Sequence, residues 1–246
     1  MDQRYTFTDF VQLIEKLRGE GGCPWDREQT HNSLKPCMTE ETAELLAAIR
    51  IFEASGDGEN MQEELGDILL QVVMHSVIAR EEGLFTIDDV IQGVAEKMVR
   101  RHPHVFGAAE ADTSEQVLSN WEEIKKKEKA GKSWIQSPLR EIPEELPALA
   151  RACKVLKKAD RLYGLADGPE NFWQRMEAAL DGLKQARSRE ESPERAAAGG
   201  AGEMKRRFSD VLCLLSEFAY REKLAPEQAL ADRIAEIVEF FEPETE

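Results

Sequence analysis

The feature that most constrains the fold of this chain is the recurrence of apolar residues at every third or fourth position, over long stretches separated by Gly and Pro. That period matches one face of an α-helix, whereas the alternating pattern of a half-buried strand is scarce. A chain of 246 residues is long enough to bury one large core or two smaller ones without a disulfide or a structural metal. We therefore predict an all-α protein.

The breaks between these stretches locate the helices of the first half, which we expect at about residues 7–18, 34–54, 61–82, 88–101 and 119–129. Thr86 is the expected N-cap of the fourth helix. The short link at residues 55–58 makes the second and third helices antiparallel neighbours. The Cys-Pro-Trp-Asp sequence at residues 23–26 is expected to form a turn.

Three prolines, Pro138, Pro143 and Pro147, have the composition of a linker. We therefore place a domain boundary near residue 136, with one domain at 1–135 and another at 136–246. The second half weakly repeats the first, because residues 206–212 resemble residues 63–69. Residues 188–202 are rich in Arg, Glu, Ala and Gly, which favours a loop, with a charged helix end as the alternative.

Two pairs of carboxylates fall on neighbouring predicted helices. Glu41 and Glu44 are three residues apart on the second helix, and Glu64 and Asp67 are three apart on the third, so each pair shares one helix face. Four acids beside an apolar seam would repel one another unless a hard divalent cation neutralised them. All-oxygen ligation suits Mg²⁺ or Mn²⁺, and Mg²⁺ commonly completes its shell with phosphate oxygens. The alternative is a solvated surface, since the chain has 48 acidic residues.

Three basic residues, Lys97, Arg100 and Arg101, lie at helical spacing near the end of the fourth helix. Arginine can bind phosphate oxygens bidentately, and lysine adds a point charge. The pattern therefore suits a phosphate-binding site. The alternative is a helix C-terminus that favours cations through its dipole.

Two tryptophans could stack on a nucleotide base. Trp25 lies in the predicted turn, and Trp121 is followed one helical turn later by Lys125, whose amine could meet a phosphate. For each tryptophan alone, a place at the edge of the core is the simpler interpretation. We expect His31 and His75 to be structural, because neither occurs with a Ser or Cys arrangement for nucleophilic catalysis.

Composition excludes several classes of partner. A formal net charge of −16 argues against a stable nucleic-acid partner, which would need a basic surface. No apolar run approaches the roughly 20 residues that a membrane span requires. The four cysteines contain no C-x-x-C pair, which favours reduced thiols and a cytoplasmic location. No P-loop motif is present.

Six short motifs follow one another in order: GCPWD at 22–26, SLKP at 33–36, EETAE at 40–44, EELGD at 63–67, RRHPHVFG at 100–107 and NWEEIK at 120–125. This series closely resembles the MazG family of nucleoside triphosphate pyrophosphohydrolases. The resemblance is strong over residues 7–129 and weak over 138–246. It implies an all-helical homodimer that hydrolyses nucleoside triphosphates, with Mg²⁺, to the monophosphate and pyrophosphate.

The resemblance also implies residue roles in the first repeat. The metal ligands would be Glu41, Glu44, Glu64 and Asp67, and Glu41 or its neighbour Glu40 would orient the attacking water. By the same resemblance, Lys97 and Arg100 or Arg101 would hold the triphosphate, and Trp121 and Lys125 would close over the nucleotide. Trp25 stays a candidate for substrate binding on the stacking argument above.

The second repeat departs from the family pattern. Arg206 and Arg207 replace its acidic pair before a retained Asp210, and Glu236, Glu239 and Phe240 stand where the basic residues would lie. We therefore expect a catalytically inactive second domain that serves dimerisation and stability. Two alternatives stay open, namely a non-catalytic nucleotide-binding or regulatory helical protein, and a pyrophosphatase selective for dNTPs or dUTP.

Overall fold

The structure is a computed structural model that describes residues 4–107, 111, 113–129, 137–164, 168–190 and 200–242. Every regular element among these residues is a helix, which confirms the all-α prediction. The chain forms two compact units, Met1–Glu128 and Lys129–Glu246. No helix in the described ranges is both long and apolar enough to cross a membrane.

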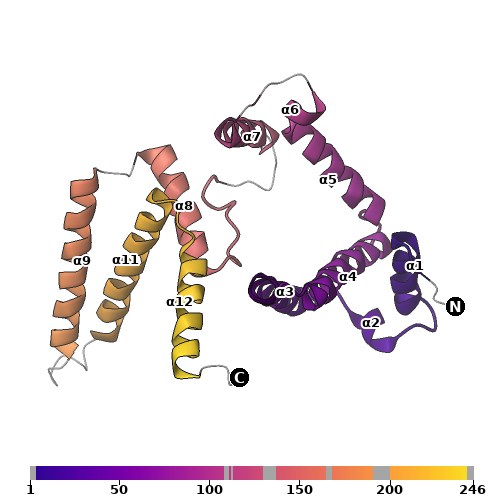
Figure 1. The fold of residues 1–246 in the computed structure, drawn as a ribbon, viewed down its shortest axis with the longest axis horizontal. Helices are drawn as coiled ribbons and strands as arrows, with labels where there is room; N and C mark the ends of the chain where they lie inside the picture. The colour runs from indigo at the N-terminus through magenta and orange to yellow at the C-terminus, as the bar shows by residue number, and fades with distance from the viewer. Residues whose placement is uncertain are drawn as a thin grey trace. The chain divides into compact units, whose positions relative to one another are not determined.

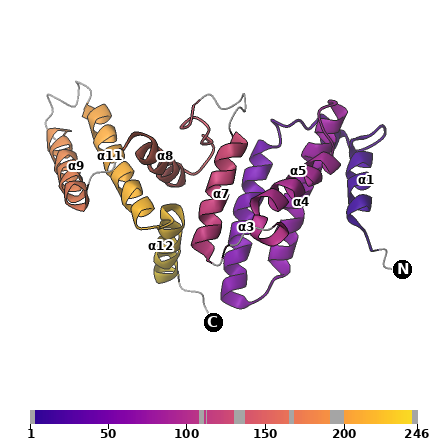
Figure 2. The same cartoon turned by 90° about the horizontal axis from the view of Figure 1, so that it is seen from above.

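The helices of unit 1, shown in Figures 1 and 2, are α1 (Phe7–Arg18), α2 (Pro24–Glu28), α3 (Lys35–Ser55), α4 (Glu59–Glu81), α5 (Ile87–Arg101), α6 (Pro103–Phe106) and α7 (Ser114–Lys129). The starts of α1 and α5 are fixed by capping boxes, in which Thr6 pairs with Asp9 and Thr86 with Asp89. The end of α3 is set by Gly56, whose φ of 74° is a left-handed conformation that glycine adopts without strain.

The core of unit 1 lies at the C-terminal half of α4. Helices α3 and α4 pack side by side, as Figure 2 shows, while α1 packs against α4. The buried cluster joins these elements through Ile14, Leu34, Val73, Met74, Val77 and Ile78. None of the first twelve residues of α4 is buried, so the burial of this helix is concentrated in its C-terminal half.

Unit 2 contains α8 (Ala148–Tyr163), α9 (Pro169–Glu190), α11 (Gly200–Arg221) and α12 (Pro226–Phe241). Helix α11 packs against both α8 and α9, and α12 packs against α8. The interior includes a charged residue, Glu217, whose carboxylate accepts hydrogen bonds from Arg175 and Arg221. Both guanidinium groups also lie over the ring of Phe172, at 5.7 Å and 5.3 Å from its centroid.

Several helix boundaries differ from the sequence predictions. The predicted turn at 23–26 is wrong, because Pro24 begins a five-residue helix; proline suits the first turn of a helix, where its missing N–H is not needed. A further short helix, α6, follows α5, and α7 begins at Ser114 rather than at 119. Within the predicted loop 188–202, residues 188–190 and 200–202 are helical, and the residues between them lie outside the described part. Residue 136, the predicted boundary, lies outside it as well.

Candidate functional site

Three of the four predicted metal ligands meet between α3 and α4. Carboxylate oxygens of Glu41, on α3, and of Glu64 and Asp67, on α4, all lie within 4.8 Å of one another, and all three residues are half-buried. Glu44, one helical turn after Glu41, is exposed and is not a member of this cluster. The structure thus brings together a three-carboxylate group, with Glu44 at its edge.

The acids of the cluster repel one another, because the described residues place no basic side chain in an ion pair with them. The pKa of Glu41 is raised, first by burial and then by repulsion from Asp67, Glu44, Glu64 and Glu40. The pKa of Glu64 is raised by burial and by repulsion from Glu44 and Asp67. None of the ion pairs among the described residues joins the three acids to a basic side chain.

The donor set fits a hard divalent cation. Three carboxylates close together supply oxygen ligands, and a doubly charged ion would remove the repulsion that contributes to the raised pKa values of Glu41 and Glu64. Three protein ligands also leave positions for water or substrate oxygens, as Mg²⁺ sites commonly do. The half-buried location weakens solvent screening of that attraction.

The basic residues form a second group at the end of α5, together with α7. Arg101 donates to Oε2 of Glu128 from Nη2, at 2.5 Å, and from Nε, at 3.0 Å, and Nε also donates to Oε1 at 3.3 Å. Arg100 donates from Nε to Oε1 of the same carboxylate at 2.7 Å. These hydrogen bonds, those from Arg101 above all, lower the pKa of Glu128 to about 2. Lys97 lies one turn earlier on α5 and is half-buried.

Trp121 belongs to this second group. The guanidinium carbon of Arg101 lies 5.4 Å from the centroid of the indole, and Nζ of Lys125 lies 5.9 Å from it, which are distances of cation–π contacts. The indole Nε1 is buried and has no hydrogen-bond partner among the described residues. The structure therefore brings together Arg100, Arg101, Trp121 and Lys125.

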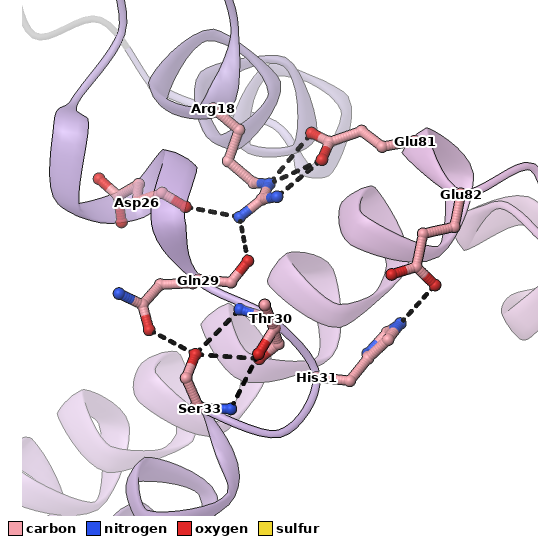
Figure 3. A network of polar contacts seen from close by, with 8 residues as sticks. All are labelled: Arg18, Asp26, Gln29, Thr30, His31, Ser33, Glu81 and Glu82. Carbon is pink, nitrogen blue, oxygen red and sulfur yellow. Dashed lines mark hydrogen bonds and ion pairs between the residues drawn. The ribbon is translucent and has the colours of Figure 1, made fainter.

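Trp25 lies on α2, which is held in place by Arg18 of α1. The guanidinium of Arg18 donates from Nη1 to the backbone oxygens of Asp26 and Gln29, at 2.5 Å and 3.1 Å, and forms a bidentate ion pair with Glu81 of α4 (Figure 3). The side chain of Gln29 donates in turn to the backbone oxygen of Trp25. The indole itself is 59% exposed, so this tryptophan is a surface residue on an anchored helix.

The acidic cluster and the basic group belong to different helices, the acids to α3 and α4 and the basic residues to α5 and α7. Figure 1 shows α5 leaving the end of α4 and ending, with α6 and α7, away from the α3–α4 pair. The acids lie in the first halves of α3 and α4, whereas Arg100 and Arg101 are the last two residues of α5. The acidic cluster and the basic group of unit 1 are thus carried by different pairs of helices.

Two features were missed by sequence reasoning. Glu128 appeared only as part of a charged helix, and nothing in its spacing to residues 100 and 101 predicts the contact. His31 and His75 stack with an interplanar angle of 3°, and their Nδ1 atoms are 2.8 Å apart. Burial and the neighbouring His31 lower the pKa of His75.

Comparison with known proteins adds independent information. Residues 29–106 match the model of the MazG nucleotide pyrophosphohydrolase domain, a range that contains the three clustered acids. A Thermotoga maritima protein named nucleoside triphosphate pyrophosphohydrolase/pyrophosphatase MazG is 39% identical over 235 residues, which are 96% of this chain and 84% of that protein.

Two further relatives match a smaller part of the chain. An uncharacterized Bacillus subtilis protein, YabN, is 52% identical over 153 residues, which are 62% of this chain and 30% of YabN. An Escherichia coli K12 nucleoside triphosphate pyrophosphohydrolase is 45% identical over 149 residues, which are 60% of this chain and 55% of that enzyme. The chain thus spans less than two thirds of the length of these two relatives.

Proposed function

The chain belongs to the MazG nucleotide pyrophosphohydrolase family, and on that premise we propose that it hydrolyses nucleoside triphosphates to nucleoside monophosphates and pyrophosphate. The observation that carries the proposal is the cluster of Glu41, Glu64 and Asp67, which lies inside the matched domain. The nucleotide substrate itself is taken from the names of the Thermotoga and Escherichia relatives.

The three acids would hold a divalent cation, with Mg²⁺ favoured and Mn²⁺ a possible substitute. Such an ion would supply positive charge to phosphate oxygens and make a bound water more acidic. Glu44, at the edge of the cluster, adds negative charge that raises the pKa of both Glu41 and Glu64, so it would increase the attraction for the cation.

The reaction would be an in-line attack of water on the α-phosphorus, with pyrophosphate leaving. Glu41 or the adjacent exposed Glu40 would accept a hydrogen bond from that water and orient it. Lys97, Arg100 and Arg101 would bind the triphosphate oxygens.

The base would be held by aromatic faces. Trp121 already carries two cationic neighbours, Arg101 and Lys125, so a base stacked on it would lie close to groups that bind phosphate. Trp25 offers a second indole, which is exposed and lies on a fixed helix.

We further propose that the chain acts as a homodimer. Large apolar side chains of unit 1 are exposed on the same helices that carry the acids, among them Leu46 (60% exposed), Phe52 (41%) and Leu65 (51%). Surfaces of this kind mark protein interfaces. A second copy would cover them and is also a source of basic side chains for the acidic cluster.

Unit 2 would serve stability and dimerisation rather than catalysis. Arg207 stands at the position of Glu64 in the sequence repeat. Its side chain packs against Gly182 of α9, where a Cβ on residue 182 would lie 3.5 Å from it. Arg206 and Asp210 are exposed. Within the described residues, a cluster of three acids that could hold a cation lies in unit 1 alone.

The test is turnover of each NTP and dNTP by the purified chain with Mg²⁺ or Mn²⁺, scored by release of pyrophosphate. Glu64→Gln should abolish turnover, since it removes a ligand charge and keeps the shape of the side chain. Glu53→Gln, at an exposed position of α3, is the matched control and should keep full activity. Binding of nucleotide without turnover would instead make the chain a regulatory binder, and activity on dNTPs alone would make it a selective enzyme.

A further inference from the structure

We propose that Glu128 is an internal competitor for the phosphate-binding edges of Arg100 and Arg101, and that a polyphosphate must displace it to bind these arginines. As far as it concerns a triphosphate substrate, this inference rests on the proposed function. The competition itself is a property of the residues at the ends of α5 and α7.

The contact uses the donors that a phosphate would need. Nε and Nη2 of Arg101, the edge through which arginine also binds phosphate, both donate to Oε2 of Glu128, and Nε donates to Oε1 as well. Nε of Arg100 donates to the same carboxylate. The side chains of Arg101 and Glu128 are only 15% and 12% exposed. A phosphate oxygen cannot reach these donors while the carboxylate occupies them.

The competitor stays charged at neutral pH. The two arginines hold the pKa of Glu128 near 2, so its carboxylate remains ionised under ordinary assay conditions. A polyphosphate carries several negative charges against the single charge of the carboxylate. The arginines therefore bind a polyphosphate more strongly than they bind Glu128, but their hydrogen bonds to Glu128 must break first.

Displacement of Glu128 would act on a whole face of α7. Trp121, Lys125 and Glu128 are spaced at four and three residues, so they share one face of the helix. Arg101 contacts this face at two points, the indole of Trp121 and the carboxylate of Glu128. Release of the carboxylate would loosen the end of α7 and uncover the indole Nε1, which is buried without a partner among the described residues.

The experiment compares Glu128→Gln with the matched control Glu123→Gln, an exposed glutamate of the same helix. Inorganic tripolyphosphate is titrated into each full-length variant and the wild type by calorimetry, with EDTA present so that the acidic cluster takes no part. Circular dichroism checks that helix content is unchanged. Both substitutions remove one negative charge, so their difference isolates the contact with the arginines.

We expect Glu128→Gln to bind tripolyphosphate at least about threefold more tightly than the wild type. In the wild type the ion pair with Glu128 lowers the fraction of molecules whose arginines can bind phosphate, and the variant lacks this ion pair. Glu123→Gln should stay close to the wild type. If Glu128 instead orients the arginines for phosphate, the variant will bind more weakly. Weaker binding, equal binding in both variants, or no binding by any of the three proteins would overturn the inference.

A second variant at the same position keeps the inference testable if Glu128→Gln fails to fold. Glu128→Asp keeps the charge but is one methylene too short to bridge both arginines, so it should also bind more tightly, by a smaller factor. Pyrophosphate release by the wild type is measured separately. Its absence would refute the proposed function and leave the tripolyphosphate comparison valid.

Discussion

Replacing Arg18 with methionine should lower the free energy of unfolding of unit 1 by about 3 kcal/mol, because one guanidinium joins α1, α2 and the end of α4. Methionine preserves much of the alkyl packing of Arg18, whose side chain is 6% exposed. The loss therefore comes from polar groups left without a partner. The helix that would be released, α2, carries Trp25.

The magnitude follows from the three sets of partners. The backbone oxygens of Asp26 and Gln29 are part-buried, and the loss of each hydrogen bond from a charged donor is taken as about 1 kcal/mol, because water can partly replace it. The ion pair with Glu81 adds about 1 kcal/mol, a value for a pair open to solvent, since that glutamate is 41% exposed.

The assay is urea unfolding followed by circular dichroism, with the free energy taken by linear extrapolation at unchanged slope. Arg80→Met is the matched control, because Arg80 also forms an ion pair between α4 and α1, with Glu15, but is 47% exposed. It should cost less than about 1 kcal/mol. An equal decrease in the free energy of unfolding in the two variants would refute the argument. It would mean that burial of the guanidinium and its two backbone contacts do not make Arg18 more stabilising than Arg80.

Two further predictions concern pH and assembly. Burial and His31 depress the pKa of His75 below its usual 6.5, so the unfolded chain binds more protons below that pH and the stability of the fold should fall. His75→Gln should flatten this pH dependence in thermal melts between pH 7.5 and 5.5. An unchanged slope would contradict His75 as the cause. Leu46→Glu should convert the homodimer to a monomer in light scattering, and a wild type that is already monomeric would exclude the proposed dimer.

Local sequence signals predicted the elements whose causes are local. The helix at 7–18 and the Thr86 cap depend on neighbouring residues, and both are present in the structure. The pairing of Glu41 with Glu64 and Asp67 was predictable because a short link, three residues in the structure, forces two long helices together. Glu44 shares the helix face of Glu41, but spacing alone does not fix how far along the neighbouring helix each oxygen can reach.

The contacts that sequence reasoning missed join residues far apart in the chain. Arg18 and Glu81 are 63 residues apart, and Arg101 and Glu128 are 27 apart. In a chain with 32 basic and 48 acidic residues, pattern alone cannot select one partner among so many. The same holds for the stacking of His31 on His75, which depends on how the loop before α3 crosses α4.

The uneven burial of α4 has a consequence for how unit 1 opens. Its C-terminal half carries the core residues Val73, Met74, Val77 and Ile78, whereas its first twelve residues, with Glu64 and Asp67, are not buried. Backbone amides of the first half should therefore exchange with solvent through local fraying, and those of the second half through global unfolding. A cation that joins Glu41 to Glu64 and Asp67 would slow exchange in the first half of α4, so cation binding at the acidic cluster would attach the less buried half of this helix to α3.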